Sequence, residues 1–200
     1  MKIHNFEQGS QEWLQARAGK LTGSDFHYYF GNSEKKKTML RIKAGERVTG
    51  QLSDKEIFSN KSMERGNEQE QSAIDTYSFE SGNEVNQVGF CELSESVGCS
   101  PDGLVGDDGI IEIKSQDFNQ FIKLLQDQKP CPIYNTQIQF NLYVTDRKWC
   151  DFISYNPKFI QKPIQILRVM RNEEDIERIK TTIKIIDQEI NNIINLIKQK

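Results

Sequence analysis

The stretch SPDGLVGDDGIIEIKS, residues 100 to 115, places two charged side chains on an apolar segment that follows an aspartate-containing turn. Isoleucines flank Glu112 and Lys114, and this pattern predicts a mostly buried β-strand. Because strand side chains alternate, Glu112 and Lys114 project to one face, and Asp102, at the end of the preceding hairpin arm, can turn toward that face. Burying charge is costly without a partner, so these side chains need a reason to be there.

Two carboxylates that converge with an ammonium group form a site suited to a hard divalent cation. Mg²⁺ is held by a few carboxylate oxygens and retains several of its waters. A cation at this position would lower the pKa of a bound water and stabilise charge on a phosphate, while Lys114 could orient or deprotonate the attacking water. The set therefore predicts phosphodiester hydrolysis. The alternative that the same residues allow is an edge strand with a surface ion pair.

The whole chain has the size and composition of one globular domain. Two hundred residues suit a single domain over 1–200. No apolar run reaches the roughly 18 residues that span a bilayer, and MKIHNFEQGS lacks the apolar stretch of a signal peptide. We expect a cytoplasmic protein without membrane contact. Its four cysteines show no CxxC spacing, so we expect free buried thiols: Cys91, Cys99, Cys131 and Cys150.

The net charge of −3 excludes a protein that binds nucleic acid through overall basicity. Positive charge is nevertheless concentrated in KKKTMLRIKAGER, residues 35 to 47. Such a run forms either a solvated face or a contact with phosphates. The candidate DNA contacts in it are Lys35, Lys36, Lys37 and Arg41.

Local patterns predict an α/β fold with a mixed central sheet flanked by helices. Ser10 is a plausible N-cap for a first helix, a second helix begins after Thr22 and Gly23, and a polar loop follows to about residue 60. A helix then ends at Gly82, with an apolar side made of Ala73, Ile74, Tyr77 and Phe79. Strands are expected around 84–93, 96–100, 109–114, 148–155 and 163–170, and helices around 117–127 and 132–145.

The last segment predicts a long C-terminal helix at about 173–198. Its isoleucines recur at spacings of three and four, at 176, 179, 183, 186, 190, 193 and 197. This seam can dock on the protein's own core, which we favour, or form a subunit contact, in which case isoleucine at both seam positions favours more than two strands.

Four blocks of the chain resemble the lambda-type viral recombinase exonucleases, a branch of the PD-(D/E)xK nuclease superfamily. Pro101-Asp102, nine residues and then Glu112-Ile113-Lys114 match the superfamily motif. The blocks occur in family order from about residue 10 to 157 and read WLQARAGKLTGSDF, ERGNEQEQSAIDTYSFESG, CSPDGLVGDDGIIEIKS and YNTQIQFNLYVTDRKWCDFISYNP. The resemblance implies a restriction endonuclease-like core.

The resemblance also implies a metal site. Asp102, Glu112 and the backbone carbonyl of Ile113 would hold one or two Mg²⁺ ions, with Mn²⁺ as a substitute, and Lys114 would activate water. An acidic residue on the helix before the sheet joins this site in the family. Four residues after Gly66, the matching position is Glu70, with Glu68 as the alternative if the register differs.

A pocket for a 5′-phosphate is implied at Arg17, Ser24 and Gln137. A guanidinium can bind phosphate through two hydrogen bonds, and a hydroxyl near a helix N-terminus adds a donor. Each of these residues also has a simpler interpretation when taken separately: Arg17 as a surface arginine and Ser24 as a helix cap. Gln137 and Gln139 do not share a helix face, so only one of them should point into the site, and Gln137 matches the family position better.

The implied activity is a Mg²⁺-dependent 5′-to-3′ exonuclease that digests the 5′-phosphorylated strand of linear duplex DNA and leaves a 3′ overhang for recombination. Family members work as ring-shaped trimers beside a single-strand annealing protein, and Met63 aligns with their strand-separating wedge. The alternatives are a PD-(D/E)xK endonuclease with another DNA substrate and a DNA-end-binding protein whose nuclease site is inactive.

Overall fold

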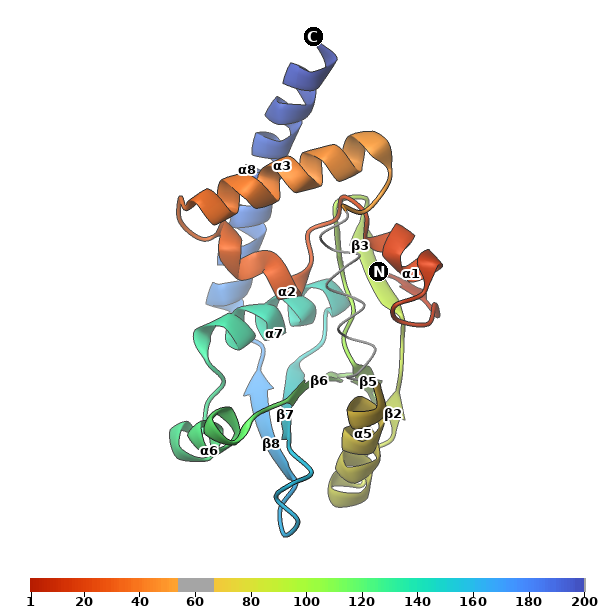
Figure 1. Ribbon diagram of the computed structural model, residues 1–200, viewed down its shortest axis with the longest axis vertical. Helices are drawn as coiled ribbons and strands as arrows, with labels where there is room; N and C mark the ends of the chain where they lie inside the picture. Colours follow the sequence, from red (N-terminus) through yellow and green to blue (C-terminus); the bar gives the residue numbers. More distant parts are fainter. Residues whose placement is uncertain (54–66, 200) are drawn as a thin grey trace.

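The computed structural model describes residues 1–53 and 67–199, except for the side chains of Asn67 and Glu68 (Figure 1). Its helices are α1 (Gln11–Arg17), α2 (Gly23–Phe26), the 3-10 helix η1 (His27–Tyr29), α3 (Glu34–Thr49), α5 (Asn67–Ser81), α6 (Phe118–Asp127), α7 (Pro132–Thr145) and α8 (Glu173–Lys198). Its strands are β1 (Lys2–His4), β2 (Val85–Asn86), β3 (Phe90–Ser94), β4 (Val97–Cys99), β5 (Gly103–Val105), β6 (Gly109–Ser115), β7 (Trp149–Tyr155) and β8 (Ile164–Met170). None of the described helices is both long and apolar enough to cross a membrane.

Within the described part of the chain, the main sheet has the strand order β2-β5-β6-β7-β8. The β6 and β7 strands run parallel, and the other neighbours are antiparallel. This arrangement confirms the predicted mixed central sheet. The expected strand region before residue 100 differs, because β3 and β4 leave the main sheet and form a second, antiparallel sheet with β1.

Helices cover the two faces of the main sheet. On one face, Ile110 and Phe152 belong to a cluster that includes Ile138 of α7 and Ile186 of α8. On the other face, Ile111 packs in a cluster with Tyr77 of α5. The alternation of side chains along β6 therefore directs Glu112 toward the α7 side, since Glu112 shares its face with Ile110.

The predicted polar loop after the second helix is wrong for residues 34–49, which form α3. The Oγ atom of Ser33 caps this helix by accepting a hydrogen bond from the Lys36 backbone N–H, and Gly50 ends it in the left-handed conformation. The helix is short of apolar residues, so its periodicity is weak. Its buried side includes Lys43 and Glu46, which pair at 2.9 Å and so make burial of two charges possible.

Phe79 was expected on the apolar side of α5, but its side chain is 90% exposed. Ala73, Ile74 and Tyr77 are buried as predicted. Phe79 lies two residues beyond Tyr77, about 200° around the helix, so it faces away from the sheet. The helix ends as expected, because Gly82 has a φ of +70° that other residues rarely adopt.

The isoleucine seam of α8 docks on the protein's own core for most of its length. Ile176, Ile179, Ile183, Ile186 and Ile190 are all buried, and α8 packs on α3 and α7. The last turns extend past α3, and Ile197 is half exposed (Figure 1).

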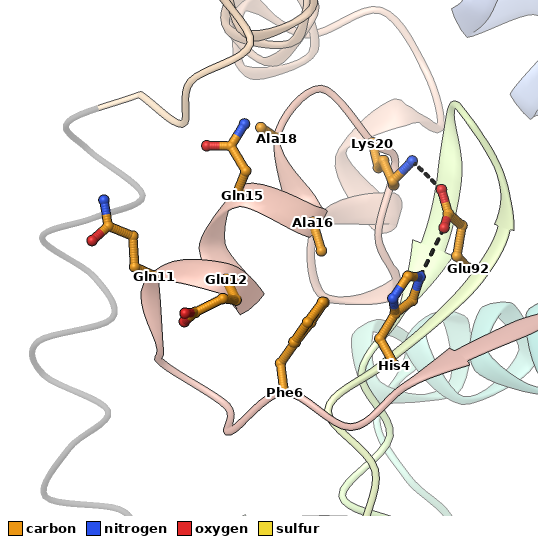
Figure 2. Close-up of a pocket in the computed structure, with 9 residues that line it drawn as sticks. All are labelled: His4, Phe6, Gln11, Glu12, Gln15, Ala16, Ala18, Lys20 and Glu92. Atoms are coloured by element: carbon orange, nitrogen blue, oxygen red, sulfur yellow. Dashed lines mark hydrogen bonds and ion pairs between the residues drawn. The ribbon is translucent and has the colours of Figure 1, made fainter.

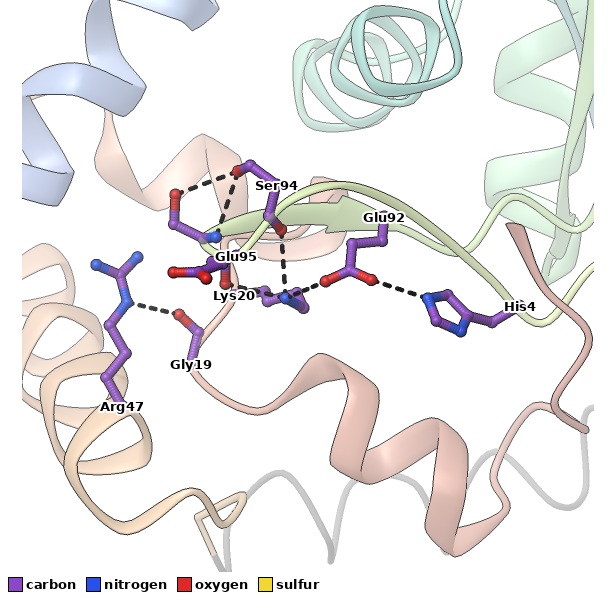
Figure 3. Close-up of polar contacts among 8 residues, drawn as sticks. His4, Gly19, Lys20, Arg47, Glu92, Ser94 and Glu95 are labelled. Atoms are coloured by element: carbon purple, nitrogen blue, oxygen red, sulfur yellow. Dashed lines mark hydrogen bonds and ion pairs between the residues drawn. The ribbon is translucent and has the colours of Figure 1, made fainter. Parts of the chain in front are cut away.

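A polar network ties the N-terminal segment to the smaller sheet (Figure 3). The Lys20 ammonium donates to Glu92 at 2.8 Å and to the carbonyls of Ser94 and Glu95, while His4 Nε2 lies 2.8 Å from the second Glu92 oxygen. These contacts fix the segment between α1 and α2, both of which supply residues to the candidate site.

The cysteine prediction holds for three of the four thiols. Cys91, Cys99 and Cys150 are free and buried, whereas Cys131, at the N-terminus of α7, is free but exposed.

Candidate active site

The hairpin of β5 and β6 brings Asp102 next to Glu112. Gly103 pairs with Ile111, so the residue before Gly103 lies beside the residue after Ile111. The Asp102 side chain is fixed there, because its Oδ2 accepts a hydrogen bond of 2.5 Å from the backbone N–H of Ile113.

The Glu112 carboxylate is 1% exposed and surrounded by donors. Its Oε1 atom accepts from Gln137 Nε2 at 2.6 Å and lies 2.7 Å from Lys114 Nζ. Its Oε2 atom accepts from Asn141 Nδ2 at 3.0 Å. The two amides come from α7, which crosses this face of the sheet, so α7 and β6 together determine the carboxylate's orientation.

Lys114 supplies a positive charge beside the carboxylates. Burial lowers the pKa of its ammonium group, but the carboxylates of Glu112 and Asp102 raise that pKa by more, so the net shift is upward. The ammonium also lies 5.6 Å from the centre of the Tyr134 ring. Lys114 is therefore protonated at neutral pH in this arrangement.

Three carboxyl groups share the site's negative charge. Burial raises the pKa of Asp102 well above its usual value, and the charges of Glu112 and Glu70 raise it further. Burial also raises the pKa of Glu70, with a second contribution from Glu112. Glu70 on α5 is thus close enough to both β6 and Asp102 for electrostatic interaction, and Lys114 alone does not neutralise the group.

The donor set fits a magnesium ion that retains waters. Among the described residues, no three His, Cys, Asp or Glu side chains are grouped closely enough to hold a metal by themselves. Mg²⁺ needs only one or two carboxylates when water or phosphate oxygens complete its octahedron. Asp102 and Glu112 supply hard oxygens, and their shared excess of negative charge is what a divalent cation would neutralise.

One cavity of about 250 Å³ joins the carboxylates to the predicted phosphate pocket. Arg17 and Ser24 line it with Asp102, Glu112 and Lys114. The remaining lining residues are Gln8, Trp13, Thr22, Gly23, Asp25, Ser100, Gln137 and Asn141. The fold thus brings together residues from α1, α2, β6 and α7 that are far apart in the sequence.

The Arg17 guanidinium stacks over Trp13, 4.3 Å from the ring centre, and its NH1 donates to Ser100 Oγ at 3.4 Å. Ser24 lies 3.4 Å from Thr22 through their hydroxyl oxygens. Trp13 also donates to Ser100 Oγ at 2.9 Å. The guanidinium is therefore held at the cavity wall by residues that sequence reasoning did not single out.

Gln137 and Gln139 point to different places. Gln137 lines the cavity and contacts Glu112, whereas Gln139 donates to the Met170 carbonyl and accepts from the Asn172 N–H. Asn141 was missed in the sequence. Its spacing of four from Gln137 on one helix was the signal that could have found it.

The basic residues of α3 are partly engaged in contacts within the protein. Lys36 pairs with Glu189 of α8 at 2.9 Å, and the Lys35 ammonium lies 4.7 Å from the Tyr28 ring centre. Lys37 pairs with Glu34 on the surface, and Arg41 is exposed. Met63 and the side chain of Glu68 lie outside the described residues.

A second cavity, of about 630 Å³, lies on the side of α1 that carries Glu12, Gln15 and Ala16 (Figure 2). It is larger than the candidate site but contains none of the predicted site residues. Of its two carboxylates, Glu92 is already paired with His4 and Lys20. Size alone therefore does not identify the functional cavity.

Comparison with known proteins identifies similar chains and folds. The sequence model of the family described as the YqaJ-like viral recombinase domain matches residues 12–148 of this chain. An alkaline exonuclease from Laribacter hongkongensis (LHK-Exo) is 32% identical, with a TM-score of 0.86 over 95% of this chain and 97% of that chain. Its complex with dAMP, also 32% identical over the same shares of both chains, has a TM-score of 0.87.

Two further similar proteins extend the comparison. A phage-related exonuclease from Haemophilus somnus 129PT shares the fold, at 19% identity and a TM-score of 0.70 over 89% of this chain and 96% of that chain. The uncharacterized protein R354 of Acanthamoeba polyphaga mimivirus is 30% identical over 171 residues, which is 76% of this chain. This chain spans only 30% of the length of that curated relative.

Proposed function

Because this chain belongs to the YqaJ-like viral recombinase family, with the fold of an alkaline exonuclease, it is a nuclease that acts on DNA, and we propose a specific reaction for it. The reaction is Mg²⁺-dependent 5′-to-3′ digestion of the 5′-phosphorylated strand of linear duplex DNA. Its product is a duplex with a 3′ overhang, which serves recombination. The observation that carries this proposal is the shared cavity, which joins Asp102, Glu112 and Lys114 to Arg17 and Ser24.

Each residue of the proposed site has a separate task. Asp102, Glu112 and the Ile113 carbonyl would hold one or two Mg²⁺ ions, with Glu70 adding negative charge, and Mn²⁺ would substitute. The bound cation would supply Lewis-acid stabilisation of the phosphate's developing charge and a lowered pKa for water. Arg17 and Ser24 would hold the terminal 5′-phosphate. Gln137 already donates its amide to Glu112, so its proposed contact with phosphate is the weaker one.

Lys114 would orient and deprotonate the attacking water. Burial lowers its pKa, whereas the charges of Glu112 and Asp102, the hydrogen bond to Glu112 and a smaller contribution from Tyr134 raise it. Neutralising those carboxylates removes the upward contribution, so burial then favours the neutral amine that can accept a proton. The raised pKa of Lys114 is thus compatible with its proposed role as a base.

The similar exonuclease has been solved in complex with dAMP, a molecule that contains a 5′-phosphate, which supports a nucleotide-binding cavity in this fold. We further propose a ring-shaped homotrimer that encloses the duplex, contacts to its backbone from Lys35, Lys36, Lys37 and Arg41, and Met63 as the wedge. A single-strand annealing protein is the proposed partner, and the cytoplasm of the bacterial host is the proposed location.

The test compares cleavage of three DNA substrates by the wild-type protein and by Lys114→Ala in Mg²⁺. The substrates are linear duplex with a 5′-phosphate, the same duplex with a 5′-hydroxyl, and a closed circle. We expect the wild-type protein to digest only the 5′-phosphorylated strand of the linear duplex. Lys114→Ala should digest that strand at a rate lower by about 100-fold or more. Lys148→Ala is the matched control, because Lys148 is an exposed lysine paired with Asp108 outside the cavity.

Other outcomes would redirect the proposal. Cleavage of the closed circle would indicate an endonuclease. Tight binding to duplex ends without strand loss would indicate an end-binding protein. Equal activity of Lys114→Ala and wild type would exclude this cavity as the catalytic site.

A further inference from the structure

We propose that Asn141 is a positioning residue that orients the Glu112 carboxylate for binding of a divalent cation. The inference rests on the proposed nuclease site and adds to it a residue that does not touch the reacting atoms. It follows from the distribution of hydrogen bonds around Glu112, from the way Asn141 itself is held, and from a close approach to Gly23.

The two oxygens of Glu112 have unequal environments. Oε1 has two partners, Gln137 Nε2 and the Lys114 ammonium, whereas Oε2 accepts from Asn141 Nδ2. A carboxylate offers about four lone-pair positions, so these three contacts leave room for one more ligand, on Oε2. The direction of the Asn141 amide determines which lone pair of Oε2 is left for the cation.

Asn141 is held by its burial in the protein and by its hydrogen bond to the Glu112 carboxylate. Its side chain is 2% exposed in the middle of α7, where asparagine has a poor helix propensity. A buried amide there needs hydrogen-bond partners, and Glu112 provides one. Because the amide is neutral, it orients the carboxylate without neutralising the negative charge that attracts a cation.

Gly23 links this contact to the other half of the cavity. A Cβ atom on Gly23 would lie 2.5 Å from Asn141 Oδ1 and 3.2 Å from the Gln137 carbonyl oxygen. Only a residue without a side chain lets the start of α2 approach α7 this closely. The absence of a side chain at Gly23 therefore leaves room for the Asn141 amide beside Glu112, next to the segment that bears Ser24.

The test measures binding of Mn²⁺ alone to the full chain, from the loss of the electron paramagnetic resonance signal of free Mn²⁺. Leucine has a side chain of similar size to asparagine but no hydrogen-bond donor. We expect Asn141→Leu to raise the Kd for Mn²⁺ by about 10- to 100-fold. We expect Gly23→Ala, which retains Asn141 but crowds its side chain, to raise the Kd in the same direction, so the inference remains testable if Asn141→Leu does not fold. DNA cleavage should recover toward the wild-type rate at saturating metal.

Gln139→Leu is the matched control. Gln139 is a buried amide on the same helix, but its hydrogen bonds go to Met170 and Asn172 and not to Glu112. We expect it to destabilise the fold with less than about a twofold change in Mn²⁺ affinity.

Three results would overturn the inference. If wild type binds Mn²⁺ and both Asn141→Leu and Gly23→Ala bind it equally well, the positioning role is wrong and the proposed function stands. If Gln139→Leu weakens binding as much as Asn141→Leu, the effect is a general loosening of α7. If wild type neither binds Mn²⁺ nor cleaves DNA, the proposed function fails and this inference fails with it.

Discussion

Glu112 and Asp102 are neighbouring carboxylates, but their surroundings stabilise the negative charge of Glu112 more than that of Asp102. Glu112 has two amides and an ammonium group around it, which compensate the cost of burial. Asp102 has one backbone N–H donor, and burial together with two negative neighbours raises its pKa. The charged form of Asp102 therefore destabilises the folded protein without metal, and a bound cation can offset this cost.

The first prediction concerns Asp102→Asn. A raised folded-state pKa means that the folded protein binds more protons than the unfolded chain, so stability falls as pH rises from the unfolded value toward the folded one. At pH 8 the neutral amide avoids this loss and can still accept from Ile113. We expect the variant, without metal, to melt a few degrees higher than wild type, since about 1 kcal/mol corresponds to roughly 2–4 °C in a domain of this size.

Calorimetry at pH 5 and pH 8, with and without Mg²⁺, checks this prediction. Mg²⁺ should raise the melting temperature of wild type but not of Asp102→Asn, and the variant should not cleave DNA. A variant that is less stable than wild type at pH 8 in the absence of metal would contradict it.

The second prediction concerns Arg17, which is held over Trp13 and beside Ser100. A planar guanidinium can bind a terminal phosphate through two hydrogen bonds, whereas an ammonium binds it as a point charge. We expect Arg17→Ala to reduce the preference for 5′-phosphate over 5′-hydroxyl ends by about 10- to 100-fold, and Arg17→Lys to retain part of it. The measurement is the ratio of kcat/KM on the two duplexes.

Arg178→Ala is the control for this experiment, because Arg178 is exposed on α8 and stacks on Phe30 outside the cavity. It should leave the ratio unchanged. An undiminished preference in Arg17→Ala would exclude this arginine from the phosphate pocket.

The helix α5 is anchored to the sheet by a partly buried polar network as well as by apolar contacts. The Tyr77 hydroxyl donates to Asp151 Oδ2 at 2.7 Å, and Arg168 donates to both oxygens of Asp151 at 2.9 Å. Arg168 in turn lies 3.7 Å from the Trp149 ring centre. This network holds the helix that carries Glu70 against β7 and β8.

The third prediction therefore concerns Tyr77→Phe. Removing a hydrogen bond to a buried carboxylate should cost about 1.5–3 kcal/mol of unfolding free energy at pH 8. Burial, followed by the contact with Asp151, raises the pKa of Tyr77 to about 12. The stabilisation is fully present below the ordinary tyrosine pKa near 10 and is lost as pH rises through 12, so the two proteins should converge in that window.

Urea denaturation between pH 8 and pH 12 measures this difference. Tyr28→Phe, at a half-buried ring of η1, is the control and should change stability by less than about 0.5 kcal/mol. A constant difference between wild type and Tyr77→Phe across the whole pH range would contradict the assignment.

In the molecule as a whole, α8, the last helix of the chain, packs against α3 and α7. Ile186 is fully buried against a core shared with α3 and α7, and Arg47 of α3 pairs with Asp187 at 2.7 Å. The end of the same helix, with Ile197 half exposed, extends beyond this core. The same isoleucine spacing therefore continues from the buried part of α8 into its exposed end.

The fourth prediction compares the two parts of this helix. Ile186→Ala should cost about 2–4 kcal/mol of unfolding free energy, because a cavity forms in a closely packed core. Ile197→Ala should cost less than about 0.5 kcal/mol. Denaturant unfolding measures both, and light scattering measures the molecular mass of each variant. A lower mass for Ile197→Ala would show that the end of α8 forms a subunit contact.

Local signals were sufficient for most elements but not for all of them. Ser10, Gly82 and the α8 isoleucines act within one or two turns of a helix, so their effects are readable in sequence. The α3 helix was missed because its buried side includes Lys43 and Glu46, which apolar periodicity counts as surface. Phe79 was misplaced because hydrophobicity was given more weight than its angle around α5.

Local sequence was enough to predict that Glu112 and Lys114 lie on one face of β6 after an aspartate turn, and these residues also carry the family resemblance. The hydrogen bond from Asn141 to the second oxygen of Glu112, across 29 residues, became evident only from the packed fold. The same is true of Arg17, which meets Ser100 across 83 residues. Such contacts depend on how α1 and α7 pack against the sheets. The spacing of Gln137 and Asn141 indicates a shared helix face, but it does not indicate which strand that face meets.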